Sequence, residues 1–94
     1  MEVKEQIKNR VRAYGVNENV IGYEMVCDLI KYMYDDIQNG KKPKMSDHYY
    51  RLAVKYNISQ LSVGNALRYA VCVSNEYGKG LNVKTLVENV LRNL

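Results

Sequence analysis

Apolar residues recur at intervals of three or four along almost the whole chain, and this spacing constrains the fold more than any other feature. Such spacing places apolar side chains along one face of an α-helix, whereas a half-buried strand requires strict alternation. The longest stripe, in which each residue follows the last by four, consists of Ile21, Met25, Leu29, Met33 and Ile37. The sequence therefore predicts an all-α fold.

Helix breakers and capping residues divide this pattern into five predicted helices. Gly15 and Gly40 end the first two, because glycine adopts the left-handed conformation of a helix C-terminus. The linker with Pro43 cannot be helical, since proline lacks the amide hydrogen. Gly78 ends a fourth helix predicted over about 60–77. The predicted N-terminal caps are Asn17 or Asn19 for the second helix, Ser46 or Asp47 for the third and Asn82 for the fifth.

The length of 94 residues fits one domain, and we expect residues 1–94 to form a single unit. Cys27 and Cys72 have no paired spacing, so neither a zinc site nor a redox pair is indicated. No apolar run reaches the roughly eighteen residues of a membrane span, and the charged N-terminus lacks the apolar core of a signal peptide. We expect a cytoplasmic protein without cofactor, metal or membrane contact.

Acidic and basic residues are segregated between neighbouring segments of a chain whose net charge is +4. In residues 18–38 a single base, Lys31, accompanies the acids Glu18, Glu24, Asp28, Asp35 and Asp36. In residues 41–55 a single acid, Asp47, accompanies the bases Lys41, Lys42, Lys44, Arg51 and Lys55. One predicted element is acidic and the next is basic, and the overall charge permits nucleic-acid binding without requiring it.

Residues 49–68 satisfy the pattern of a helix-turn-helix, in which a small residue lets two helices cross and apolar residues hold them together. Ala53 is the small residue, and Asn57 lies in the turn, where asparagine tolerates left-handed geometry. The residues expected to be buried together are Leu52, Ala53, Ile58, Val63, Ala66 and Leu67, with Tyr56 also facing inward. We predict the unit over about 46–77, although a helical hairpin packed only for structure satisfies the same pattern.

A helix-turn-helix that binds double-stranded DNA inserts its second helix in the major groove. The outward residues predicted to meet base edges are Ser59, Gln60, Leu61, Ser62, Gly64, Asn65 and Arg68. Gln60 and Asn65 are amides suited to adenine, and Arg68 suits guanine or a phosphate. The lysines predicted to contact phosphates are Lys41, Lys42, Lys44, Lys55 and Lys79.

From about Ile7 to Gly80 the chain resembles the C-terminal effector domain of the sporulation-initiation response regulator of spore-forming Firmicutes, the stage zero A family. The resemblance lies in Gly15-Val16, Gly22-Tyr23, Tyr34, Asp36-Ile37, Leu52-Ala53, Lys55-Tyr56-Asn57, Ala66, Arg68, Ala70 and Gly78, in order and spacing. It implies an all-helical DNA-binding domain that regulates transcription at promoters, normally as a dimer driven by phosphorylation of a preceding receiver domain. A homodimer is therefore a possible state of this chain.

The family's recognition helix carries arginine, glutamate and arginine where this chain has Ser62, Gly64 and Asn65. Its base-reading chemistry, and with it the family's DNA site, is therefore not expected here. The alternative function is a helix-turn-helix-derived module for protein interaction or dimerisation without sequence-specific DNA binding. The outward positions of Leu61 and Gly64 favour this alternative.

No catalytic constellation is visible, so we expect neither an enzyme nor a small-molecule substrate. His48 stands alone at the start of a predicted helix and is expected on the surface. Asp35 and Asp36 are adjacent and point different ways around a helix, as an exposed acidic end would. The tyrosines expected in or beside the core, rather than stacked on bases, are Tyr23, Tyr32, Tyr34, Tyr56 and Tyr69.

Overall fold

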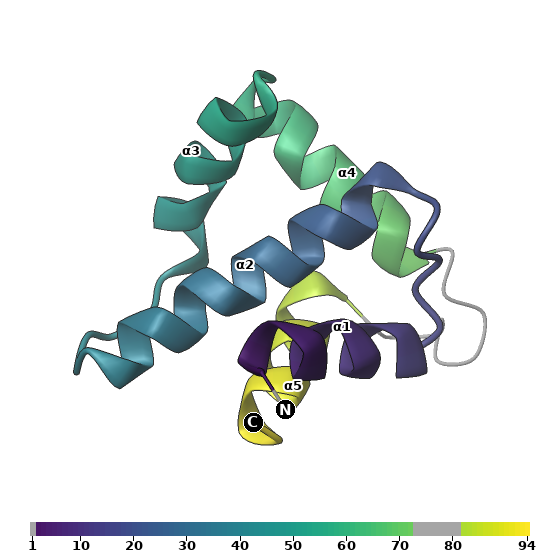
Figure 1. Cartoon of the computed structure of the whole chain (residues 1–94). Coiled ribbons are helices and arrows are strands. Elements are labelled where there is room, and N and C mark those ends of the chain that lie inside the picture. The colour runs from purple at the N-terminus through teal and green to yellow at the C-terminus, as the bar shows by residue number, and fades with distance from the viewer. Residues whose placement is uncertain (1, 73–81) are drawn as a thin grey trace.

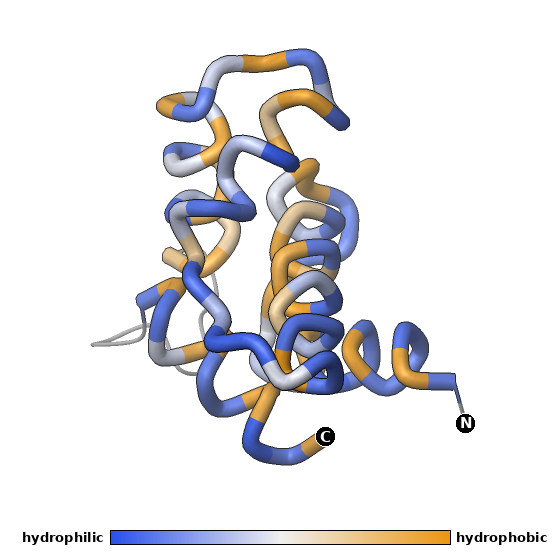
Figure 2. The backbone as a smooth tube through the Cα atoms, turned by 90° about the vertical axis from the view of Figure 1, so that its left-hand side faces the viewer, coloured by the Kyte–Doolittle hydropathy of each residue, from blue (hydrophilic) through white to orange (hydrophobic). Residues whose placement is uncertain are grey.

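A computed structural model describes residues 2–72 and 82–94 and confirms the all-α fold (Figure 1). Its five helices are α1 Val3–Ala13, α2 Ile21–Gln38, α3 Met45–Tyr56, α4 Gln60–Cys72 and α5 Val83–Arg92. No strand occurs in the part of the chain that the structure describes. Apolar and polar positions interleave along the helices, as the periodicity predicted (Figure 2).

Helix α2 is the centre of the fold and packs against all four other helices (Figure 1). It contributes both faces to the core, because consecutive residues from Met25 to Ile30 are buried. Helix α1 covers one side together with α5, and α3 and α4 cover the other. The largest fully buried side chains are Ile7, Met25, Leu29, Ile30, Leu52, Leu67 and Leu86. The pair α3–α4 is thus fixed by packing on the central helix.

Helix α2 begins in close contact with α4. A Cβ atom placed on Gly22 would lie 2.3 Å from the carbonyl oxygen of Ala66 and 2.7 Å from the Cβ of Ala70. Both distances are shorter than van der Waals contact. The two backbones can therefore meet only because residue 22 lacks a side chain and residues 66 and 70 carry small ones.

Three of the predicted helix ends agree with the structure. Gly15 and Gly40 have positive φ angles of 87° and 74°, and each follows the end of its helix. Asn82 caps α5 by accepting a hydrogen bond from the backbone N–H of Thr85 at 2.8 Å. These local signals needed no tertiary information, because a capping side chain and a left-handed residue act within one turn.

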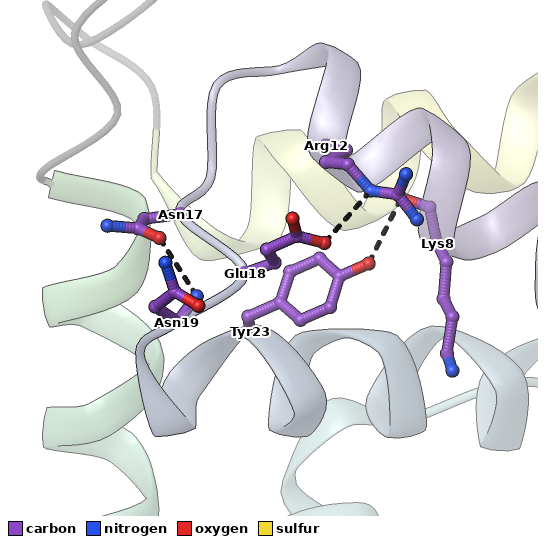
Figure 3. A network of polar contacts seen from close by, with 6 residues as sticks. All are labelled: Lys8, Arg12, Asn17, Glu18, Asn19 and Tyr23. Atoms are coloured by element: carbon purple, nitrogen blue, oxygen red, sulfur yellow. Dashed lines mark hydrogen bonds and ion pairs between the residues drawn. The ribbon is translucent and has the colours of Figure 1, made fainter.

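The predicted caps of α2 and α3 are wrong. Val20 precedes α2 without capping it, and the Asn17 side chain instead accepts from the backbone N–H of Asn19 at 2.8 Å (Figure 3). Arg12 and Glu18 also close this connection, with 3.5 Å between Nε and Oε2.

Helix α3 begins earlier than predicted. Lys44 occupies its N-cap position without a side-chain hydrogen bond, so Ser46 and Asp47 lie inside the first turn. The earlier start lets Met45 pack against the core from a helical position. Tertiary packing overrode the local capping preference here.

Candidate nucleic-acid interface

Helices α3 and α4 are joined by a turn of three residues, Asn57, Ile58 and Ser59. Asn57 has the predicted left-handed conformation with φ of 55°, the only non-glycine residue with positive φ in the described chain. The backbone N–H of Ile58 donates to the Ala53 carbonyl at 3.0 Å and satisfies the end of α3. Ser59 Oγ accepts from the backbone N–H of Ser62 at 3.1 Å and caps α4. The turn is closed on both sides by hydrogen bonds.

The predicted apolar lock between the two helices is present. Leu52, Val63 and Leu67 are completely buried, and Ala53 is buried where the helices meet. Ile58, Ala66 and Tyr56 are partly buried and pack against the same core. One face of α4 is therefore committed to the interior.

The opposite face of α4 is open to solvent. The residues on it that were predicted to meet bases and are exposed are Ser59, Gln60, Leu61, Ser62, Asn65 and Arg68. Gly64 is partly covered, because a Cβ there would lie 3.7 Å from a ring carbon of Tyr49 on α3. The structure thus brings the predicted base-facing residues together on one exposed surface, which we call the α4 face.

Two side-chain hydrogen bonds organise the α4 face. Ser59 Oγ donates to Ser62 Oγ at 3.0 Å. Arg68 Nη2 donates to Asn65 Oδ1 at 2.5 Å, one turn further along the helix. Hydroxyl, amide and guanidinium groups therefore dominate this surface, and Arg68 is its only charged residue among the described positions.

Sequence reasoning missed a row of polar contacts between α2 and α3, which we call the polar ladder. It consists of Asp28, Tyr32 and Asp36 on α2 with His48, Arg51, Lys55 and Tyr56 on α3. The α2 residues are four apart, and His48, Arg51 and Lys55 on α3 are three or four apart, so each set forms one stripe, with Tyr56 next to Lys55. The order of the contacts shows that the helices run antiparallel. The contacts of Asp28 with Lys55 and of Asp36 with His48 account for part of the segregation of acids and bases in the sequence.

One end of the polar ladder is the contact between His48 and Asp36. The ring Nε2 of His48 lies 2.6 Å from Asp36 Oδ2, and the Tyr32 ring lies beside the imidazole at 5.5 Å between centroids. His48 is 4% exposed, so the prediction of a surface histidine is wrong. Its Nδ1 is buried without a hydrogen-bond partner. The sequence signal that could have predicted this contact was the spacing of residues 28, 32 and 36, which matches the spacing of the polar residues on α3.

The other end of the polar ladder is centred on the buried carboxylate of Asp28. Its Oδ2 accepts from Lys55 Nζ at 2.8 Å and from the Tyr56 hydroxyl at 2.7 Å. The hydrogen bond to Asp28 raises the pKa of Lys55. Burial is the main cause of the raised pKa of Tyr56, and the Asp28 carboxylate is the second cause. Between the two ends, the Arg51 guanidinium lies 3.8 Å from the Tyr32 ring centroid.

The predicted phosphate contacts divide into two groups. Lys41, Lys42 and Lys44 are exposed in the connection between α2 and α3. The Lys55 side chain is 48% exposed, but its ammonium is paired with Asp28. Lys79, like the predicted extension of the fourth helix to residue 77, lies outside the described residues.

The tyrosine prediction holds for four residues and fails for one. Tyr23 is buried and donates to the Lys8 carbonyl at 3.4 Å, while Tyr32, Tyr34 and Tyr56 are partly buried (Figure 3). Tyr69 is 61% exposed. Helix α4 faces α2 through the small residue Ala70, which turns its neighbour Tyr69 outward.

Comparison of the chain with protein-family models, curated proteins and solved structures found no match. None of the described helices is long and apolar enough to cross a membrane. Within residues 2–72 and 82–94, no three or more His, Cys, Asp or Glu side chains are grouped as metal ligands would be.

Proposed function

We propose that the protein is a DNA-binding transcriptional regulator whose helix α4 inserts in the major groove. The observation that carries this proposal is the division of α4 into two faces. Val63 and Leu67 anchor one face in the core, while the α4 face presents hydroxyl, amide and guanidinium groups to solvent. A helix held from behind and polar in front, after a three-residue turn, has the arrangement of a recognition helix.

Phosphate contacts would come from the connection before α3 rather than from α3 itself. Lys41, Lys42 and Lys44 are exposed there, whereas Arg51 and Lys55 are engaged in the polar ladder. A single copy with so few positive charges binds weakly, and two copies on one duplex would double the electrostatic attraction. The resemblance to the sporulation-initiation effector domain supports action at promoters in the cytoplasm.

The test is a fluorescence anisotropy titration of a labelled duplex of random sequence at several salt concentrations. If three lysines of each bound copy neutralise phosphates, log K should fall against log salt with a slope of about −2.7 per copy. Raising salt from about 50 to 200 mM should then weaken binding roughly 40-fold. Lys4→Ala is the matched control for alanine variants of the three lysines, and it should keep the wild-type slope. Lys4 is likewise exposed, but it lies on α1, which packs against α2 and α5. Absence of duplex binding at the lowest salt would refute the proposal.

The second candidate is a protein-interaction or dimerisation module, which exposed apolar side chains favour. Tyr50 and Val54 lie one turn apart on α3 and are 62% and 65% exposed. Leu61, at the start of α4, is 72% exposed. Exposed apolar groups that form one continuous patch are typical of contact surfaces. Sedimentation of the protein without DNA tests this function. Self-association that Leu61→Ser abolishes, together with no binding to duplex, would favour it over DNA binding.

A further inference from the structure

The hydrogen bond between Arg68 and Asn65 determines which base edge the α4 face complements. Both residues are exposed, and the bond from Arg68 Nη2 to Asn65 Oδ1 is 2.5 Å long. We infer that the pair recognises guanine, with Arg68 contacting the base and Asn65 positioning the guanidinium. This inference rests on the proposed insertion of α4 in the major groove.

The sequence alone suggested that Asn65 reads adenine, and the hydrogen bond argues against that. An asparagine that reads adenine accepts from the adenine N6 amino group with Oδ1 and donates to N7 with its NH₂ group. Here Oδ1 already accepts from a guanidinium, and such charge-assisted hydrogen bonds are about twice as strong as neutral ones. Oδ1 has a second lone pair, but the N6 amino group of adenine would have to share this oxygen with the positively charged guanidinium, which disfavours a second donor beside it.

The groups that remain available on the pair are mainly donors. Asn65 keeps its two amide N–H groups and one lone pair of Oδ1, and Arg68 keeps the N–H groups that Asn65 does not use. Guanine presents two acceptors in the major groove, N7 and O6, whereas cytosine presents a donor and adenine one donor and one acceptor. Thymine offers a single acceptor beside a methyl group. Guanine is therefore the base whose edge matches the pair at two points.

The surroundings of Arg68 restrict where its guanidinium can lie. Gly64 leaves space for the Tyr49 ring, which lies 3.7 Å from where a Cβ at residue 64 would be. Burial raises the pKa of Tyr49, and the positive charge of Arg68 lowers it by a smaller amount. Because the hydrogen bond to Asn65 already holds the guanidinium, Arg68 loses less side-chain entropy when it binds a base.

The experiment selects bound duplexes from a random library at low salt and then measures the affinity of the selected site against its adenine-substituted version. The variants are Arg68→Met, which removes the donors and keeps an unbranched side chain, and Asn65→Ala, which removes the positioning amide. Arg10→Met is the control, because it removes the same charge from an exposed position on α1. All three positions are exposed, and circular dichroism establishes that each variant folds.

The wild type should prefer guanine over adenine at one position by roughly 5- to 150-fold. Arg68→Met should replace this preference with one for adenine, because Oδ1 of Asn65 then accepts from the N6 amino group without a guanidinium beside it. Asn65→Ala should keep guanine as the preferred base at a reduced ratio, and Arg10→Met should keep the wild-type ratio.

Two results would overturn the inference while leaving DNA binding intact. One is a wild-type preference for adenine that persists in Arg68→Met, and the other is salt-dependent binding without any base preference. If no duplex is bound at any salt concentration, the proposed function itself fails, so the two failures are distinguishable.

Discussion

The contact between α2 and α4 at Gly22 makes a sharp prediction about stability. Adding one methyl group in Gly22→Ala would place a Cβ atom 2.3 Å from the Ala66 carbonyl oxygen, where carbon and oxygen ordinarily stay at least about 3.3 Å apart. The helices must therefore separate by about 1 Å. The obstacle is backbone rather than the end of a flexible side chain, so it cannot rotate away.

The expected cost follows from overpacking. Forced shifts of this kind destabilise by about 1–3 kcal/mol, and the better helix propensity of alanine offsets at most about 1 kcal/mol. The net cost is therefore up to about 3 kcal/mol, which for a domain of this size corresponds to a fall in Tm of up to roughly 24 °C. The chain contains its own control in Gly64→Ala, since a Cβ at Gly64 meets only a Tyr49 ring carbon at an ordinary 3.7 Å. That variant should gain about 0.5–1 kcal/mol, because glycine is unfavourable inside a helix.

Thermal unfolding monitored by circular dichroism, together with urea titration, measures both variants. Gly22→Ala should melt below the wild type and Gly64→Ala at or above it. If Gly22→Ala melts at or above the wild-type temperature, α2 and α4 do not approach as described and the orientation of the α4 face is wrong. A lower Tm for Gly64→Ala would show that the Tyr49 ring occupies the space beside residue 64.

Asp28 raises the pKa of Lys55 above its ordinary value of 10.5 and contributes to raising the pKa of Tyr56 above 10.0. The free energy of unfolding that these shifts contribute is therefore fully present below the ordinary pKa values and is lost as pH rises through the raised pKa values. Urea titrations should therefore show stability falling above about pH 10, and less steeply in Asp28→Asn; equal slopes would contradict the pairing. Iodoacetamide should label Cys72 in the folded protein and leave Cys27 unmodified, because Cys72 is exposed and burial raises the pKa of Cys27 to about 12. Peptide mass spectrometry measures the labelling of each cysteine. Lys44→Ala should weaken binding to every duplex equally in anisotropy titrations and reduce the salt slope by about one, and a loss confined to particular sequences would count against a phosphate contact.

Much of the candidate interface was predictable because it depends on one short segment. The left-handed Asn57, the buried Leu52 and Val63 and the exposure of Asn65 and Arg68 all follow from periodicity and turn chemistry within twenty residues. What Asn65 can bind was not predictable in this way. Its acceptor is occupied by Arg68, and a list of outward residues does not reveal which of them bond to one another.

The errors concern residues whose surroundings are built by distant parts of the chain. His48 was expected on the surface, yet Asp36, twelve positions earlier, holds it in a buried contact. Lys55 is paired with Asp28, 27 positions away, and the sequence did not indicate this partner. In both cases the partner lies on the preceding helix, and the segregated charges of the sequence did not reveal which residues pair.

The sequence by itself determined the all-α class, the five helices and the turn after Tyr56, because hydrophobic periodicity, glycine and asparagine act over one or two helical turns. Only the tertiary structure decided how those helices meet. The approach of α2 to α4 at Gly22 depends on side chains that are absent or small at positions more than forty residues apart. The polar ladder likewise exists only once α2 and α3 lie antiparallel. Among the described residues predicted to contact phosphate, it includes Lys55 and leaves out Lys41, Lys42 and Lys44.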